Sequence, residues 1–222
     1  PGAKDAARAA LAAWLDPARP VAVRVNAAGT PWHAADRALA GRPGVAAVML
    51  PKAEGAADLA GLPGPLIPLI ETARGMAALA AIAAAPGVLR LAFGTLDFML
   101  DLGIPADGPA LDAFRAQMAL ASRAAGIAPP IDGVTPAFDD PAPVEADTRR
   151  ALAFGFGARL LIHPRQVEPV HRAMRPAEAE LAWAREVLAL AAGAGEGAAR
   201  LGGAMVDRPV VEKARRLLAR EV

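Results

Sequence analysis

The chain has 222 residues, 55% of them hydrophobic, so it can bury a substantial core as one large domain or two small ones. Its 24 basic and 23 acidic side chains give a formal net charge of +1 without blocks of like charge, which argues against a protein that binds a nucleic-acid backbone. Cysteine is absent, which excludes disulfides and thiolate metal sites, and no apolar stretch is long enough to span a bilayer. We therefore expect a soluble, cytoplasmic protein.

Six short apolar runs recur along the chain. Most are nearly continuous in hydrophobicity, as strands buried on both faces are. They begin at residues 21, 44, 65, 88, 129 and 158 with VAVRVN, GVAAVML, PLIPLI, VLRLAF, PPIDGV and ARLLIH. Helical patterns lie between them and place on one face Leu11, Trp14 and Leu15, then Met76, Leu79 and Ile82, then Leu111, Phe114 and Met118. This alternation predicts βαβ units and a parallel sheet.

A helical section follows residue 175. Pro176 suits the first turn of a helix in RPAEAELAWAREVLAL, and GAGEGAARLGG indicates a flexible hinge before a last helix in RPVVEKARRLLARE. We predict a barrel domain over residues 1–175 and a helical C-terminal extension over residues 176–222.

Two folds with a parallel sheet are candidates, and they place their functional residues at different positions. An open, dinucleotide-type sheet needs a G-x-G-x-x-G turn after its first strand, and none follows any of the runs. A barrel places polar residues at the carboxyl ends of several strands, and five runs end in or precede Asn26, Lys52, Glu71, Asp97 and His163. The sequence therefore predicts a (β/α)₈ TIM barrel. Since that fold needs eight strands and the chain opens on a helical pattern, we expect the first strands to be absent from this chain.

Glu71 and Asp97 are candidate metal ligands. They follow consecutive strands, and neither has His or Cys close by in sequence, so together they form an oxygen-only site that suits Mg²⁺ with open positions for water and substrate. In the alternative interpretation, Asp97 caps the helix after the fourth strand and Glu71 pairs with Arg74 at the surface.

Six motifs follow one another along the chain: VAVRVNAAGTPWHAAD, VMLPKAE, LIPLIETARG, LAFGTLDF, GARLLIHPRQV and GGAMVDRPVVEKAR. In this order and spacing they resemble the citrate lyase β-subunit-like family of the HpcH/HpaI aldolase superfamily, from about residue 4 to the C-terminus. The resemblance implies a (β/α)₈ barrel that uses Mg²⁺ to make or break carbon–carbon bonds of acyl-CoA thioesters. The leading strands of that family, with an early Pro-Gly segment and an acidic strand end, have no counterpart here.

The resemblance also implies roles for single residues. Glu71 and Asp97 would hold the metal ion at the substrate. Arg24 of the RVN motif would contact the substrate, and its planar fork suits a carboxylate or oxo group; the alternative is an ion pair at the end of the barrel. Asp207 would reach a neighbouring subunit's active site as a lid residue and exchange a proton with the methyl carbon of the acyl-CoA. The extension would thus serve as a lid and oligomerisation element in a trimer or hexamer; the alternative for Asp207 is an N-cap of the last helix.

The remaining polar residues give weaker signals. His163 has no acidic residue beside it to orient the ring, so a structural role at the strand end is favoured over that of a general base. Lys52 and Thr72 lie at the same barrel face and are candidates for contact with CoA phosphate or substrate. His33 and His171 are predicted surface residues.

We expect a Mg²⁺-dependent lyase that converts a short hydroxyacyl-CoA, such as malyl-CoA, citramalyl-CoA or citryl-CoA, into an acyl-CoA and a 2-oxo acid. Whether such an enzyme acts as a lyase or as a thioesterase-coupled synthase stays open, and so do two alternatives of other kinds. One is a CoA-independent aldolase for 2-oxo acids, and the other is a non-catalytic barrel that binds acyl-CoA. The joint presence of Arg24, Glu71, Asp97 and Asp207 argues against the second, because a binding module does not need a metal pair.

Overall fold

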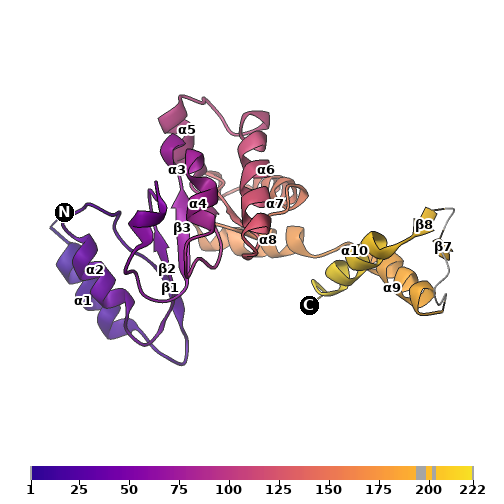
Figure 1. Cartoon of the computed structure of the whole chain (residues 1–222), viewed down its shortest axis with the longest axis horizontal. Helices are drawn as coiled ribbons and strands as arrows, with labels where there is room; N and C mark the ends of the chain where they lie inside the picture. Colours follow the sequence, from indigo (N-terminus) through magenta and orange to yellow (C-terminus); the bar gives the residue numbers. More distant parts are fainter. Residues whose placement is uncertain (1, 194–198, 202–203, 222) are drawn as a thin grey trace.

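The computed structural model describes residues 2–193, 199–201 and 204–221 (Figure 1). Its centre is a sheet of six parallel strands that lie side by side in chain order. These strands are β1 (Val21–Arg24), β2 (Val45–Leu50), β3 (Leu66–Ile70), β4 (Ala92–Phe93), β5 (Ile131–Asp132) and β6 (Ala158–Arg159). Each lies within one of the six apolar runs, so the predicted parallel strands are confirmed.

The two faces of this sheet are covered differently. The connecting helices pack on one face, where Ile70, Ile82, Phe93 and Phe98 are fully buried. The opposite face carries a separate cluster that strand residues alone contribute: Ala47, Ile67, Leu69, Ala92 and Ile131. A doubly wound sheet would reverse its strand order at a switch point, and the described sheet has no such reversal. The sheet is therefore a curled half-barrel, with β1 and β6 at its two edges.

Helices alternate with the strands as the sequence predicted. They are α1 (Lys4–Trp14), α2 (His33–Ala40), the short 3₁₀ turn η1 (Ala56–Leu59), α3 (Ala73–Ala77), α4 (Leu79–Ala83), α5 (Thr95–Leu102), α6 (Pro109–Ala124), α7 (Pro141–Ala153), the 3₁₀ turn η2 (Pro164–Gln166) and α8 (Val167–Met174). Proline occupies the first turn of α6 and of α7, where its missing N–H costs no helical hydrogen bond. None of the described helices has both the length and the hydropathy that a membrane span requires.

Helix α1 differs from the expectation in its packing. It forms where the apolar spacing predicted it, but none of its residues is buried, and the Trp14 side chain is 65% exposed. Within the described part of the chain, the predicted apolar face of α1 is therefore only partly covered, because Leu11 and Leu15 are half-buried and Trp14 is exposed.

The C-terminal section forms a group of its own beyond α8 (Figure 1). It contains α9 (Glu178–Gly193), β7 (Ala199–Leu201), β8 (Ala204–Val206) and α10 (Arg208–Leu218). Side chains from α9, β8 and α10 make a small separate core of Ala184, Val187, Val206, Ala214 and Leu217. Strand β7 lies within GAGEGAARLGG, residues 193–203, where the sequence indicated a flexible hinge, and it pairs antiparallel with β8, which directly follows that segment. The rest of that hinge, residues 194–198 and 202–203, lies outside the described residues.

Candidate functional site

The carboxyl ends of β2, β3 and β4 meet around one buried carboxylate. Glu71 directly follows β3, is 5% exposed, and accepts a hydrogen bond at Oε1 from the backbone N–H of Lys52, 2.9 Å away. Gly94 follows β4 and lies against the same side chain, because an ideal Cβ at position 94 would stand 2.6 Å from Glu71 Oε2. The Glu71 carboxylate is thus fixed between the ends of two neighbouring strands.

The charges around Glu71 show which residues share this edge of the sheet. Burial raises the pKa of Glu71 above its ordinary value, and the negative charge of Asp97 raises it further. The Lys52 amide and the charges of Lys52 and Arg24 act in the opposite direction. Asp97 lies in the first turn of α5 and Arg24 ends β1, and both are exposed. The structure therefore brings together three of the four predicted site residues.

This arrangement fits a hard divalent cation. Two carboxylates in one place repel each other, and a cation between them offsets that cost. Within the described residues, no group of three or more His, Cys, Asp or Glu side chains is arranged so that it could hold a metal ion. Glu71 and Asp97 alone suit Mg²⁺, which usually keeps several waters and takes one or two carboxylates from the protein.

The alternative interpretations of the two carboxylates are wrong. The N-cap position of α5 is Gly94, and Asp97 makes no capping hydrogen bond. Arg74 is exposed, and the described ion pairs do not join it to Glu71, which bonds to the Lys52 amide instead. Arg24 likewise takes part in none of the ion pairs among the described residues, so it does not close the barrel end as an ion-pair partner. The metal role of Glu71 and Asp97 stays a prediction.

The helix after Glu71 is fixed by two side chains. The Thr72 hydroxyl caps α3 by accepting a hydrogen bond from Gly75 N at 3.1 Å. Asp101, on α5, accepts another from Ala73 N at 2.7 Å. The predicted contact of Thr72 with CoA or substrate stays untested, and the structure adds a capping role that the sequence analysis did not assign.

The end of β1 is tied to α1 and α2 through Asn26 and Asp36. Asp36 is 6% exposed and accepts hydrogen bonds from Asn26 N at 2.8 Å and from the Arg8 guanidinium at 2.9 Å. Lys4 Nζ donates to Asn26 Oδ1 at 2.6 Å. Burial alone would raise the pKa of Asp36, but its bonds to Asn26 and Arg8 outweigh burial and lower it. These contacts hold the strand end from which Arg24 projects.

Sequence reasoning did not identify Asp36. The sequence does contain a signal for it. Asp36 lies four residues before Ala40, so both lie on the same, buried side of α2, where an apolar residue would be expected. His33, on the same helix, is predicted as a surface residue; it is half-buried, with Nδ1 2.8 Å from the Asn26 carbonyl oxygen, so its ring is only partly exposed. His171 is exposed as predicted.

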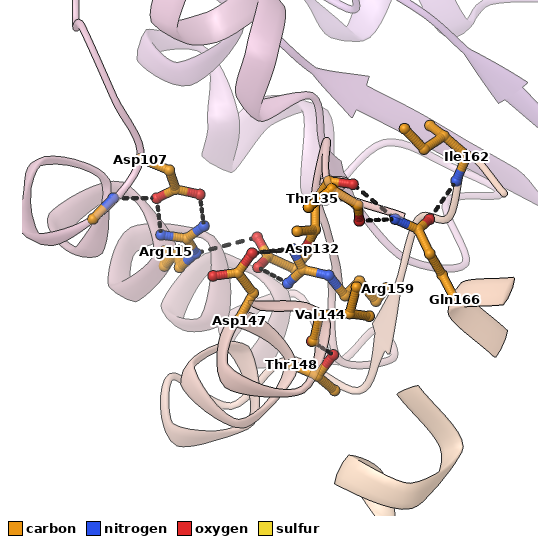
Figure 2. A network of polar contacts seen from close by, with 12 residues as sticks. Asp107, Arg115, Asp132, Thr135, Val144, Asp147, Thr148, Arg159, Ile162 and Gln166 are labelled. Carbon is orange, nitrogen blue, oxygen red and sulfur yellow. Dashed lines mark hydrogen bonds and ion pairs between the residues drawn. The ribbon is translucent and has the colours of Figure 1, made fainter. Parts of the chain in front are cut away.

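A buried ionic network supports the other half of the sheet (Figure 2). At its centre Asp132, on β5, accepts from Arg115 Nε at 3.2 Å and from Arg159 at 3.0 Å. Asp107 binds the Arg115 guanidinium with both oxygens, at 2.8 and 2.6 Å. Burial alone would lower the pKa of Arg115, but the Asp107 and Asp132 carboxylates raise it. The network joins α6 to β5 and β6.

The same network reaches the loops at the carboxyl edge. Thr135 Oγ1 donates to Asp147 at 2.6 Å and accepts from Arg159 at 2.7 Å. Gln166, 1% exposed, donates to the carbonyl oxygens of Thr135 and Ala137 at 2.8 and 2.9 Å (Figure 2). The network therefore also anchors the loops after β5 and β6.

His163 has a structural position. Its Nδ1 accepts a hydrogen bond from Arg165 N at 3.1 Å, which caps η2, and its ring stacks on Phe138 with centroids 4.8 Å apart. The structural role predicted for His163 is thus confirmed.

Asp207 lies apart from the other three predicted site residues. Its Oδ1 accepts a hydrogen bond from Val210 N at 3.1 Å, so it is the N-cap of α10. Figure 1 shows α10 far from the carboxyl ends of β2 and β3. The predicted N-cap is confirmed, and within one chain the structure does not bring Asp207 to Glu71.

Comparison with known proteins identifies the family of the chain. Residues 1–164 match the model of the HpcH/HpaI aldolase/citrate lyase family. The chain is 37% identical to a citrate lyase subunit beta-like protein of Deinococcus radiodurans, covering 100% of the chain and 81% of that protein. It is 34% identical to a (3S)-malyl-CoA thioesterase of Cereibacter sphaeroides over 89% of the chain and 73% of the relative.

Solved structures agree with these relatives. The fold matches the protein CitE of Mycobacterium tuberculosis, in complex with magnesium, acetoacetate and coenzyme A, with a TM-score of 0.86 and 38% identity. That match covers 97% of this chain and 83% of the CitE chain. The resemblance inferred from the six motifs is confirmed: the chain belongs to the HpcH/HpaI aldolase/citrate lyase family.

Proposed function

We propose that this protein is a Mg²⁺-dependent carbon–carbon lyase that cleaves a short hydroxyacyl-CoA, such as malyl-CoA, citramalyl-CoA or citryl-CoA, into an acyl-CoA and a 2-oxo acid. The observation that carries the proposal is the buried Glu71 carboxylate, held by the Lys52 amide next to Asp97 and Arg24. The complex of the similar M. tuberculosis protein with magnesium, acetoacetate and coenzyme A supports the cofactor and the substrate class.

Glu71 and Asp97 would hold the Mg²⁺. The bound ion supplies a Lewis acid that polarises an oxygen of the substrate and orients it. Arg24, exposed at the end of β1, binds the carboxylate or oxo group of the 2-oxo acid part through its planar guanidinium. Since Arg24 pairs in register with Met49, which packs on the strand-only face, its side chain lies on the face opposite the helices.

The cleavage step requires two proton transfers. The substrate hydroxyl loses its proton and becomes the oxo group as the carbon–carbon bond breaks, and the electron pair of that bond stays on the α-carbon of the acyl-CoA. That carbon then takes up a proton to become a methyl or methylene group. We assign this second transfer to Asp207, acting as general acid from a neighbouring subunit.

The role assigned to Asp207 requires that the protein forms an oligomer. Because α10 lies far from the carboxyl ends of β2 and β3 of its own chain (Figure 1), a second copy has to supply the carboxylate, and a trimer or hexamer would do so in a closed arrangement. We propose residues 1–175 as the catalytic domain and residues 176–222 as the lid and oligomerisation extension. The six strands in chain order support their being part of a (β/α)₈ barrel. The absence of cysteine from the sequence supports a cytoplasmic location.

A turnover assay tests the proposed function. The protein is incubated separately with malyl-CoA, citramalyl-CoA and citryl-CoA, with Mg²⁺ or with excess EDTA, and the 2-oxo acid is measured. We expect cleavage of at least one thioester that requires Mg²⁺ and is lost in Arg24→Met. Cleavage of none of them would contradict the proposal. If the protein instead cleaves free 2-oxo acid aldols and CoA esters leave its melting temperature unchanged, it is a CoA-independent aldolase.

A further inference from the structure

Lys52 has an unusual backbone conformation for its residue type. Its φ is 51°, and it is the one residue other than glycine with positive φ in the part of the chain that the structure describes. The left-handed region is unfavourable for residues with a Cβ, and lysine lacks the short polar side chain that helps Asn and Asp to adopt it. Such strain persists only where the surrounding structure imposes it, and it is concentrated at functional sites.

Packing on the following residue imposes this conformation. Ala53 is fully buried, and its N–H donates to the Leu69 carbonyl oxygen of β3 at 3.3 Å. The Ala53 carbonyl oxygen lies directly against Gly75 of α3, where any Cβ would overlap it. The Lys52 side chain is exposed. The turn is thus packed between β3 and α3. Because the lysine side chain is exposed, its burial does not explain the strained backbone.

The result of the strain is the direction of the Lys52 N–H. It points at Glu71 Oε1 at 2.9 Å, while Glu71 Oε2 lies on the side of Gly94. The hydrogen bond to Oε1 and the close approach of Gly94 to Oε2 together limit the rotation of the carboxylate. A residue 52 relaxed to negative φ would rotate the N–H away and free the Glu71 side chain to change rotamer.

We propose that Lys52 is a positioning residue, and that its left-handed backbone, rather than its ammonium group, orients Glu71 to receive the divalent cation. This inference rests on the proposed function in one respect, namely that Glu71 binds a divalent cation. The role of residue 52 in orienting Glu71 rests on the geometry described above. It predicts that what matters at this position is the ability to adopt positive φ.

Three substitutions separate the backbone from the charge. Lys52→Gly, Lys52→Asn and Lys52→Val all remove the ammonium group, so any effect of charge is common to them. Glycine and asparagine adopt positive φ readily, whereas β-branched valine does not. We expect metal-free crystal structures to show the bond from residue 52 N–H to Glu71 in the Gly and Asn variants and its loss in the Val variant. Calorimetric titration should show Mg²⁺ binding at least about tenfold weaker in the Val variant than in the Gly variant, the usual effect of losing a group that orients a ligand.

The outcomes against the proposal are distinct. Equal Mg²⁺ affinity in all three variants, or an intact bond to Glu71 in the Val variant, would overturn it. If Lys52→Val does not fold, Lys52→Ala is compared with Lys52→Gly instead. Equal Mg²⁺ affinity of these two variants would also overturn the proposal. If the unaltered protein binds no Mg²⁺, the proposed function fails, while the metal-free structures still decide whether residue 52 positions Glu71.

Discussion

Gly94 and Glu71 approach so closely that position 94 has no room for a side chain. An ideal Cβ on residue 94 would stand 2.5 Å from Glu71 Cβ and 2.6 Å from Oε2. The φ of Gly94 is −89°, which any residue adopts, so glycine is required here for space and not for its dihedral angles.

This contact predicts the effect of Gly94→Ala. The added methyl group displaces the Glu71 carboxylate, so Mg²⁺ affinity measured by calorimetry should fall about tenfold or more. Gly55→Ala is the matched control, because position 55 has extended backbone and nothing within 4 Å of an ideal Cβ. A Gly94→Ala variant that binds Mg²⁺ as tightly as the control would show that Glu71 is not a ligand.

Asp97→Asn should weaken Mg²⁺ binding strongly and abolish turnover without harming the fold. The substitution keeps the shape of an exposed side chain and removes one of the two proposed anionic ligands. Since loss of a group that merely orients a ligand costs 10–100-fold, we expect Mg²⁺ affinity to fall by at least about 100-fold, with turnover lost. Melting temperature without metal should not fall, because the charge of Asp97 opposes ionisation of Glu71.

The control for that variant is Asp139→Asn, which removes a carboxylate from an exposed ion pair with Arg165. It should change neither Mg²⁺ affinity nor turnover. Unaltered metal dependence in Asp97→Asn would end the assignment of this residue as a ligand.

Asp107 gives the protein a pH-dependent stability. Burial alone would raise its pKa, but hydrogen bonds and charge from Arg115 outweigh burial and hold the pKa below its ordinary value of 3.8. A carboxyl group whose pKa is lowered by folding stabilises the folded state fully above its unfolded pKa, and that stabilisation is lost as the pH falls through the folded pKa. Asp107→Asn should therefore lower the free energy of unfolding at pH 7 by roughly 1–3 kcal/mol.

Urea unfolding at a series of pH values checks this prediction. The difference between the unaltered protein and Asp107→Asn should be constant from pH 7 to about pH 5 and should shrink below about pH 4. A difference that is the same at pH 7 and pH 3 would mean that the ionised carboxylate does not stabilise Arg115.

Two substitutions of Asp207 separate helix capping from catalysis. Asp207→Ala loses the bond to Val210 N and should cost about 1 kcal/mol of stability, whereas Asp207→Asn keeps a good N-cap. Both should suppress deuterium exchange at the acyl-CoA methyl group, because neither has a carboxylate, while Mg²⁺ and 2-oxo acid binding stay nearly unchanged. Normal exchange in Asp207→Asn would reduce Asp207 to a helix cap.

Mixing inactive subunits tests whether Asp207 acts on a neighbouring chain. Some interfaces between Asp207→Asn and Asp97→Asn subunits would carry an intact metal site beneath an intact lid, so activity should partly return. If subunits demonstrably exchange and activity stays absent, the action in trans is excluded.

The sequence predicted the parts of this site that follow from strand order. Buried parallel strands have continuous apolar runs, and their carboxyl ends meet at one edge of the sheet, so Arg24, Glu71 and Asp97 could be placed together before the structure was known. The strained conformation of Lys52 could not, because it results from packing between Ala53 and Gly75, which no local pattern encodes.

The buried ionic network was also missed, for a related reason. Arg115 and Arg159 converge on Asp132 from 17 and 27 residues away, and no periodicity indicates which charges will meet. The available signal was a charged residue inside an apolar run, Asp132 in PPIDGV and Arg159 in ARLLIH, since a buried charge requires a partner.

The most direct test of the proposed reaction is a product analysis of the preferred thioester in the presence of Mg²⁺. A lyase breaks the carbon–carbon bond, so acyl-CoA and 2-oxo acid should appear in equal amounts, with no free CoA, and both should disappear with EDTA. Release of free CoA together with the intact hydroxy acid would show hydrolysis of the thioester, the activity for which the similar C. sphaeroides protein is named, and would contradict the proposed carbon–carbon cleavage.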